Sequence, residues 1–308
     1  MAKNHLLYAP VRARIDQRVE RILRELGSPA PPLRLEDVRE LLKLNLSYFS
    51  GDDDGLLSSL VSRLKIAGKQ VLKRPMLLAE AVKNLNLRAL YLPDRRRIML
   101  DDTVPKPKHR WLEAHEIVHD ALPWHHSVLL GDDEHTVTPA CHAKVEAEAN
   151  FGAGQLLFFR DRFIEEARSR PFGFESVRKL KPLFGNTLTT TFWRYVELAW
   201  AGTPLLGVIS HHPHPARRSA TFDPAKPCRH FVQSPEFAAK FSRVTESAVF
   251  ELLTTYCGSQ SAGPLGDDEM LLNDDNGERH IFHFATFYNQ HDALTLARWL
   301  RPARLTSG

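Results

Sequence analysis

Residues Arg110–His119 read R-W-L-E-A-H-E-I-V-H and contain the pattern H-E-x-x-H, formed by His115, Glu116 and His119. An α-helix turns by about 100° per residue, so side chains four residues apart lie on the same face. His115 and His119 can therefore point at one ion, and the carboxylate of Glu116 can reach a water molecule bound to that ion. The stretch predicts a metal-binding helix with a general base beside two imidazole ligands.

A catalytic zinc site usually has three protein ligands and one open position, so a third ligand must come from elsewhere in the chain. One candidate is His125, which lies six residues after His119, as the third histidine of the metzincins does. In that pattern a glycine ends the helix between the two histidines. Here Leu122 stands in its place and Pro123 follows, so His125 fits the pattern poorly.

A glutamate on a later helix is the better candidate. In the thermolysin-like zincins the third ligand is such a glutamate, and a side chain four residues after it hydrogen-bonds the first zinc histidine. Glu146 and Asn150, in the stretch E-A-E-A-N, have this spacing. Asn150 would then fix the tautomer of His115. Glu148, two residues after Glu146, is the alternative glutamate ligand.

These stretches resemble the ImmA/IrrE metallopeptidases, whose pattern is roughly R-F-x-x-A-H-E-x-x-H, then E-x-x-A-N and a pair of leucines. The matching residues here are 110–119, 146–150 and Leu156-Leu157. The resemblance covers about residues 10 to 160 and departs from the family pattern at Trp111 and in F-G-A-G after Asn150. It implies a zinc-dependent intracellular endopeptidase that cleaves a partner transcriptional repressor. The resemblance implies that His115, His119 and Glu146 bind zinc, that Asn150 hydrogen-bonds His115, and that Glu116 is the general base.

Apolar periodicity and turn signals predict an α+β fold. The resemblance implies a zincin-like domain at 10–165 with a small antiparallel sheet and, more loosely, a helical, helix-turn-helix-like linker at 166–215. We expect a smaller α/β region at 216–308. The predicted helices are 11–27, 35–43, 56–86, 143–159 and 292–300. The predicted strands are 44–49, the hairpin 88–92 with 97–100, 204–210 and 281–287. Residues 124–134 and 258–268 are predicted to be loops.

Composition sets limits on partners and location. The 308 residues are 43% hydrophobic and 25% charged, which is ordinary for a globular protein, and the formal net charge of +4 is weak evidence for nucleic acid. The stretch 187–195 could belong to a DNA-binding regulator, but its sparse positive charge argues against direct nucleic-acid binding. The three cysteines lack C-x-x-C spacing, which favours a reducing compartment. With neither a signal peptide nor a long apolar run, the sequence predicts a cytoplasmic protein that does not act at a membrane. The protein substrate is what the resemblance implies.

Two questions stay open from the sequence. The chain could be a non-catalytic sensing or protein-binding module that keeps zinc only for stability. Tyr195 and His211 are candidate donors to an oxyanion, and nothing in the sequence pattern favours one of them.

Overall fold

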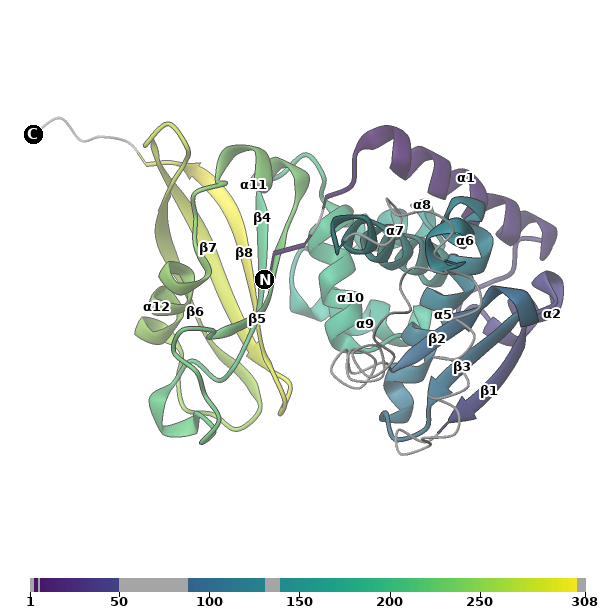
Figure 1. The fold of residues 1–308 in the computed structure, drawn as a ribbon. Helices are drawn as coiled ribbons and strands as arrows, with labels where there is room; N and C mark the ends of the chain where they lie inside the picture. Colours follow the sequence, from purple (N-terminus) through teal and green to yellow (C-terminus); the bar gives the residue numbers. More distant parts are fainter. Residues whose placement is uncertain (1–2, 5, 50–87, 131–138, 304–308) are drawn as a thin grey trace, which may run out of the picture. The chain divides into compact units, whose positions relative to one another are not determined.

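The computed structural model describes residues 3–4, 6–49, 88–130 and 139–303, so the helix predicted at 56–86 lies outside the described residues. The chain forms two compact units. We call residues 7–160 with 184–186 the helical unit, and residues 1–6, 161–183 and 187–308 the sheet unit. The predicted α+β class is confirmed: a helical N-terminal region holds a small mixed sheet, and a five-stranded antiparallel sheet follows (Figure 1).

The helical unit contains a three-stranded sheet in the order β1-β3-β2. The predicted hairpin is confirmed, because β2 pairs antiparallel with β3. The prediction of an antiparallel sheet is wrong for β1, which pairs parallel with β3. Parallel neighbours need a long crossover, and the chain between these two strands is long enough for one. The elements are α1 (Ala9–Glu25), α2 (Leu35–Leu42), β1 (Asn45–Phe49), β2 (Ala89–Leu92), η2 (Pro93–Arg95), β3 (Arg97–Asp101), α5 (Lys106–Ala121), α6 (Pro123–Leu130) and α7 (Pro139–Leu157).

Helix α6 occupies part of the range predicted to be a loop. Helix α5 ends at Ala121, and Leu122 adopts an extended conformation. Pro123 then opens α6. Proline is favoured in the first turn of a helix because its missing N–H would have no intrahelical partner there. The proline that ends the motif helix therefore starts the next one, and this places His125 close to α5.

Helix α7 packs closely against α5 and α1. A Cβ atom placed on Gly152 would lie 2.6 Å from Cγ1 of Val118 on α5 and 3.1 Å from Cγ2 of Ile15 on α1. Only a residue without a side chain fits between these helices at such a distance. The contact surface is apolar and buried, and it includes Val19, Val118, Ala149, Ala153 and Leu156. This close approach brings the polar residues of α7 next to the motif on α5.

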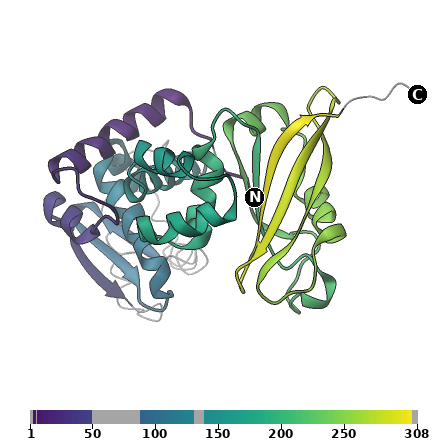
Figure 2. The same cartoon turned by 180° about the vertical axis from the view of Figure 1, so that it is seen from behind.

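The sheet unit is built on five antiparallel strands in the order β5-β4-β8-β7-β6 (Figures 1 and 2). The expected α/β architecture is therefore wrong for this part of the chain. The elements are α8 (Asp161–Arg168), α9 (Phe174–Phe184), α10 (Leu188–Arg194), the π-helical turn η3 (Tyr195–Ala199), β4 (Leu205–Ser210), η4 (Pro215–Arg217), β5 (Cys228–Gln233), α11 (Pro235–Lys240), α12 (Glu246–Tyr256), β6 (Gly263–Asn273), β7 (Arg279–Tyr288) and β8 (Ala293–Pro302).

Two predictions in this unit are wrong and two are confirmed. The predicted helix 292–300 is strand β8, which is hydrogen-bonded to β4 on one side and β7 on the other. Part of the predicted loop 258–268 is the start of β6, with an irregularity at Gly266, where φ is +133°. The strands predicted at 204–210 and 281–287 are confirmed as β4 and β7.

Both faces of the five-stranded sheet are covered. Phe237 of α11 and Phe250 of α12 belong to the core on one face. On the other face a Cβ atom on Gly207 of β4 would lie 2.8 Å from Val196 of η3. This explains why all six residues of β4 are buried. Among the described residues, no helix is both long enough and apolar enough to cross a bilayer.

The cysteines of the sheet unit are expected to resist alkylation. Cys228 and Cys257 are buried and free, and burial raises the thiol pKa in both, from 9.0 to about 12 in Cys228. Since only the thiolate reacts, a Cys141→Ser protein treated with iodoacetamide at pH 8 should be modified only after unfolding. Modification of the folded protein at the rate of the unfolded chain would contradict this expectation.

The pKa of the Cys228 thiol is higher in the folded protein than in the unfolded chain. The stability that Cys228 contributes should therefore be lost as pH rises from 9 to about 12.

Candidate metal centre

Helices α5 and α7 bring three predicted ligands together. The Nε2 atoms of His115 and His119 lie 3.1 Å apart. Oε2 of Glu146 lies 3.2 Å from the first of them, and Oε1 lies 3.5 Å from the second. The histidine side chains are buried, with 11% and 3% of their surface exposed, whereas that of Glu146 is 44% exposed. Two buried imidazoles and one more accessible carboxylate thus converge at one point.

Asn150 fixes the tautomer of the first histidine. Its Oδ1 lies 3.1 Å from Nδ1 of His115. An amide oxygen only accepts, so Nδ1 carries the proton and donates it, and Nε2 of His115 is left with a lone pair. Glu146 and Asn150 are one helical turn apart on α7, which lets one side chain face the cluster while the other holds the histidine behind it.

A chain of hydrogen bonds fixes the tautomer of the second histidine. The buried carboxylate of Glu148 accepts from Nε2 of His125 at 3.2 Å and from Nε1 of Trp124 at 2.7 Å. Nδ1 of His125 therefore has no proton and accepts from Nδ1 of His119 at 3.0 Å. His125 and Glu148, considered above as alternative ligands, lie behind His119. Their bonds leave Nε2 of His119 with a lone pair facing the cluster.

The donor atoms fit a tetrahedral zinc ion. Zinc–nitrogen and zinc–oxygen bonds of about 2.0–2.1 Å place neighbouring ligand atoms of a tetrahedron about 3.3 Å apart. Here the two nitrogens lie 3.1 Å apart, and the two Glu146 oxygens lie 3.2 Å and 3.5 Å from His115 Nε2 and His119 Nε2 respectively. With both Nδ1 atoms protonated, the cluster consists of two lone pairs and a carboxylate with no proton between them. Such a group of acceptors repels itself unless a cation binds between them.

The charges around the cluster favour a cation. Burial opposes the negative charge of Glu146, but the neighbouring imidazoles of His115 and His119 lower the pKa of its carboxyl group below the ordinary value. Burial also opposes a charge on His115, but Glu146 raises the pKa of that imidazole. Burial and the neighbouring His119 lower the pKa of His125 to about 3, which keeps it neutral. A proton and a metal ion would therefore compete for the same position.

Glu116 lies buried beside the cluster. Burial raises the pKa of its carboxyl group, partly offset by His119 and His115 and by a backbone hydrogen bond from Tyr91 on β2. A raised pKa suits a group that accepts and releases a proton near neutral pH. Because the backbone of β2 holds the side chain, the carboxylate has a defined position at the base of the site.

Sequence reasoning missed the residues that hold α5 in place. Asp120 is buried next to His119. The hydroxyl of Tyr91 donates to it, and Arg96 forms an ion pair with it at 3.2 Å. The only signal in the sequence was an acidic residue, Asp120, directly after His119. Its partners Tyr91 and Arg96 come from the β2–β3 hairpin, and no sequence pattern links them to it. Tyr195 and His211 belong to the sheet unit.

A second acidic cluster lies near the β6–β7 turn. Asp274, Glu278 and His280 bring ligand atoms within 4.8 Å of one another. However, Nε1 of Trp299 donates to Nδ1 of His280 at 3.1 Å, so Nε2 of that histidine carries the proton. This protonated nitrogen faces Asp274 at 3.5 Å. The nitrogen that faces the carboxylates therefore carries a hydrogen, whereas a metal ligand needs a lone pair there.

Comparison with known proteins gives a likeness of fold. No protein-family model matches the sequence, and no curated protein matches it. A solved structure titled "Mycobacterium tuberculosis transcriptional regulator" aligns with 94% of this chain and 80% of its own length, with a TM-score of 0.54 and 14% sequence identity. At that identity the two chains share the arrangement of their elements.

Proposed function

We propose that the helical unit is a zinc-dependent endopeptidase of the ImmA/IrrE type, with a zincin-like arrangement of its helices. His115, His119 and Glu146 bind the zinc ion, and Glu116 is the general base. The observation that carries the proposal is the convergence of two imidazole lone pairs, 3.1 Å apart, with the Glu146 carboxylate, whose two oxygens lie 3.2 and 3.5 Å from them, beside a buried glutamate. This is the ligand set of glutamate-type zinc peptidases.

The protein groups have separate tasks in this mechanism. Zinc bound here would polarise a peptide carbonyl and lower the pKa of water at the open coordination position. Glu116 accepts a proton from the attacking water and returns it to the leaving amine. Asn150 and the pair His125–Glu148 keep the Nε2 atoms of the ligand histidines directed at the ion.

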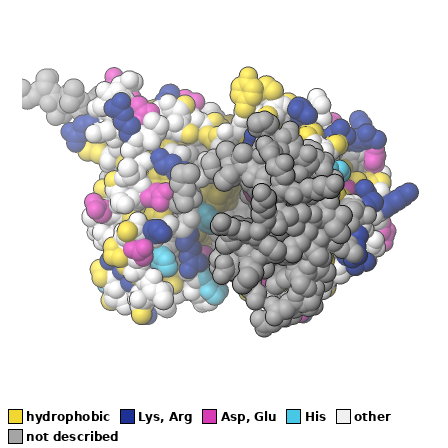
Figure 3. Space-filling model, in the orientation of Figure 1, with side chains coloured by type: hydrophobic (Ala, Val, Ile, Leu, Met, Phe, Trp, Pro, Cys, Tyr) yellow, Lys and Arg dark blue, Asp and Glu magenta, His cyan; other side chains and the backbone are white. Residues whose placement is uncertain are grey.

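We propose that the substrate is a protein, and specifically a transcriptional repressor. The sequence resemblance to the ImmA/IrrE metallopeptidases supports this. Figure 3 shows Lys and Arg interspersed with Asp and Glu on the visible face of the sheet unit. Nucleic-acid binders usually gather positive charge on one face, so the mixed charges seen here do not favour a nucleic-acid substrate. A cytoplasmic location is part of the same proposal.

The second candidate is a zinc-stabilised regulatory module without peptidase activity. One observation favours it: the similar solved structure is titled a regulator, and a regulator can act through binding alone. Both candidates bind zinc at the same residues, so metal content does not separate them. They differ in whether Glu116 acts as a general base.

The decisive experiment compares cleavage by the wild type and by Glu116→Gln. Each is co-expressed with candidate repressors encoded nearby, and products are identified by mass spectrometry. The variant should keep its zinc, and its cleavage rate should fall by a factor of about 10² to 10⁴, since it lacks a proton acceptor.

The matched control is Glu25→Gln, which changes an exposed ion pair with Arg21 on the same unit and should cleave normally. Cleavage by Glu116→Gln at the wild-type rate would refute the assigned base. Absence of products from the wild type with every repressor would favour the regulatory module.

A further inference from the structure

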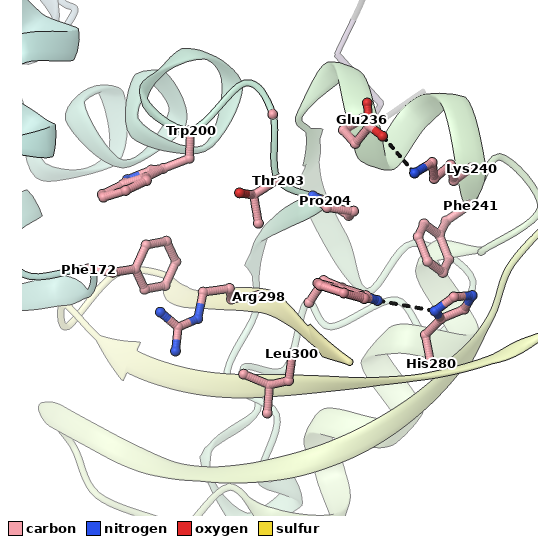
Figure 4. A pocket seen from close by; sticks show the side chains of 12 residues that line it. Phe172, Trp200, Thr203, Pro204, Glu236, Lys240, Phe241, His280, Arg298 and Leu300 are labelled. Carbon is pink, nitrogen blue, oxygen red and sulfur yellow. Dashed lines mark hydrogen bonds and ion pairs between the residues drawn. The ribbon is translucent and has the colours of Figure 1, made fainter. Parts of the chain in front are cut away.

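The sheet unit contains a pocket of about 590 Å³ (Figure 4). This volume falls in the range of about 300 to 1,000 Å³ that is typical of small-molecule sites. The walls come from the α8–α9 connection, from the segment before β4, from α11 and the residue after it, and from β7 and β8, and they include several aromatic side chains. The apolar lining consists of Phe172, Trp200, Pro204, Phe241, Trp299 and Leu300.

Three side chains that can carry a positive charge line this pocket, and two of them are already paired. Lys240 forms an ion pair with Glu236 at 2.7 Å. His280 accepts from Trp299 through Nδ1 and directs Nε2 at Asp274. In Figure 4 both lie at the end of the pocket near Phe241.

Arg298 is the third, at the opposite end beside Phe172 and Trp200 (Figure 4). Its guanidinium lies 4.8 Å from the centre of the Phe172 ring. Among the described residues, no carboxylate forms an ion pair with it and no acceptor hydrogen-bonds it. Stacking on Phe172 restrains the planar group while leaving its N–H donors unused.

We propose that this pocket binds a small aromatic carboxylate. Arg298 binds the carboxylate through two parallel hydrogen bonds, a geometry that the guanidinium fork matches. The flat body of the ligand lies among the aromatic side chains, whose faces and edges favour another ring. The site is separate from the zinc cluster, and the proposal does not depend on peptidase activity or on bound zinc.

The test uses the full chain and a matched pair of probes, naphthalene-2-carboxylate and naphthalene-2-carboxamide, in isothermal titration calorimetry. The two differ in charge but hardly in shape. The wild type should bind the carboxylate at least about tenfold more tightly than the amide, because a hydrogen bond to a charged group contributes more than one between neutral groups. Arg298→Gln should remove this preference, and Arg298→Lys should keep part of it.

The control variant is Arg178→Gln, because Arg178 also lies over an aromatic ring of the sheet unit, that of Phe287, but does not line the pocket. It should bind both probes as the wild type does. Far-ultraviolet circular dichroism establishes whether each variant is folded. Equal affinity of the wild type for the two probes, a preference that survives in folded Arg298→Gln, or no binding of the carboxylate at millimolar concentration would each overturn the proposal.

Discussion

Replacement of Glu146 by glutamine is expected to lower zinc affinity by roughly a hundredfold or more, because the cluster loses its only anionic ligand and one of three protein ligands. The neighbouring variant Glu148→Gln should lose less, about tenfold, since Glu148 acts on the ion only through His125 and His119. The two residues are two positions apart on one helix. Comparing their variants therefore distinguishes a residue that coordinates zinc from one that only holds a ligand histidine in place.

Zinc affinity is measured by competition with a chromophoric chelator, and metal content by elemental analysis of the dialysed protein. The thermal midpoint of each variant is recorded without zinc, so that a loss of folding is not mistaken for a loss of ligand. A larger loss in Glu148→Gln than in Glu146→Gln would mean that the two glutamates have exchanged roles.

Gly152→Ala is expected to destabilise the helical unit by about 1–3 kcal/mol, because a methyl group there overlaps Val118 on α5. Separating the helices should also weaken zinc binding, since α7 holds Glu146 and α5 holds both histidines. The control is Gly202→Ala, where a Cβ atom has no neighbour within 4 Å. It should leave stability and zinc affinity unchanged.

Val118→Ala supplies the rescue for this substitution, because it removes two of the three methyl groups that the new Cβ would meet, including the nearest one. In a double-mutant cycle, measured by urea unfolding, the combined variant should be more stable than the sum of the single changes predicts, by about 0.5–3 kcal/mol. Additive effects would show that the Gly152 contact does not set the distance between α5 and α7.

Elements that rest on local signals were predicted correctly. The motif helix, the glutamate helix and the turn between β2 and β3 follow from spacing of apolar residues and from proline positions. The proximity of His115, His119 and Glu146 in the structure follows from helical periodicity, since each helix only has to present one face to the other.

The errors come from contacts between segments distant in sequence. Strand β8 has an apolar spacing that suits a helix, but hydrogen bonds from β4 and β7 on either side make it a strand. The parallel pairing of β1 has the same kind of origin. His125 stood out by its spacing from His119, yet its role depends on Glu148, which lies on another helix.

The unequal exposure of the three proposed ligands has a kinetic consequence for a bound ion. A chelator removes a metal ion stepwise, and it first takes the position of the ligand that moves out most easily. Here that ligand is Glu146, whose side chain is 44% exposed, while His119 is 3% exposed and held from behind. Exchange of the ion should therefore begin with dissociation of the Glu146 carboxylate on α7. The exchange rate should be set by how often this one carboxylate leaves the ion.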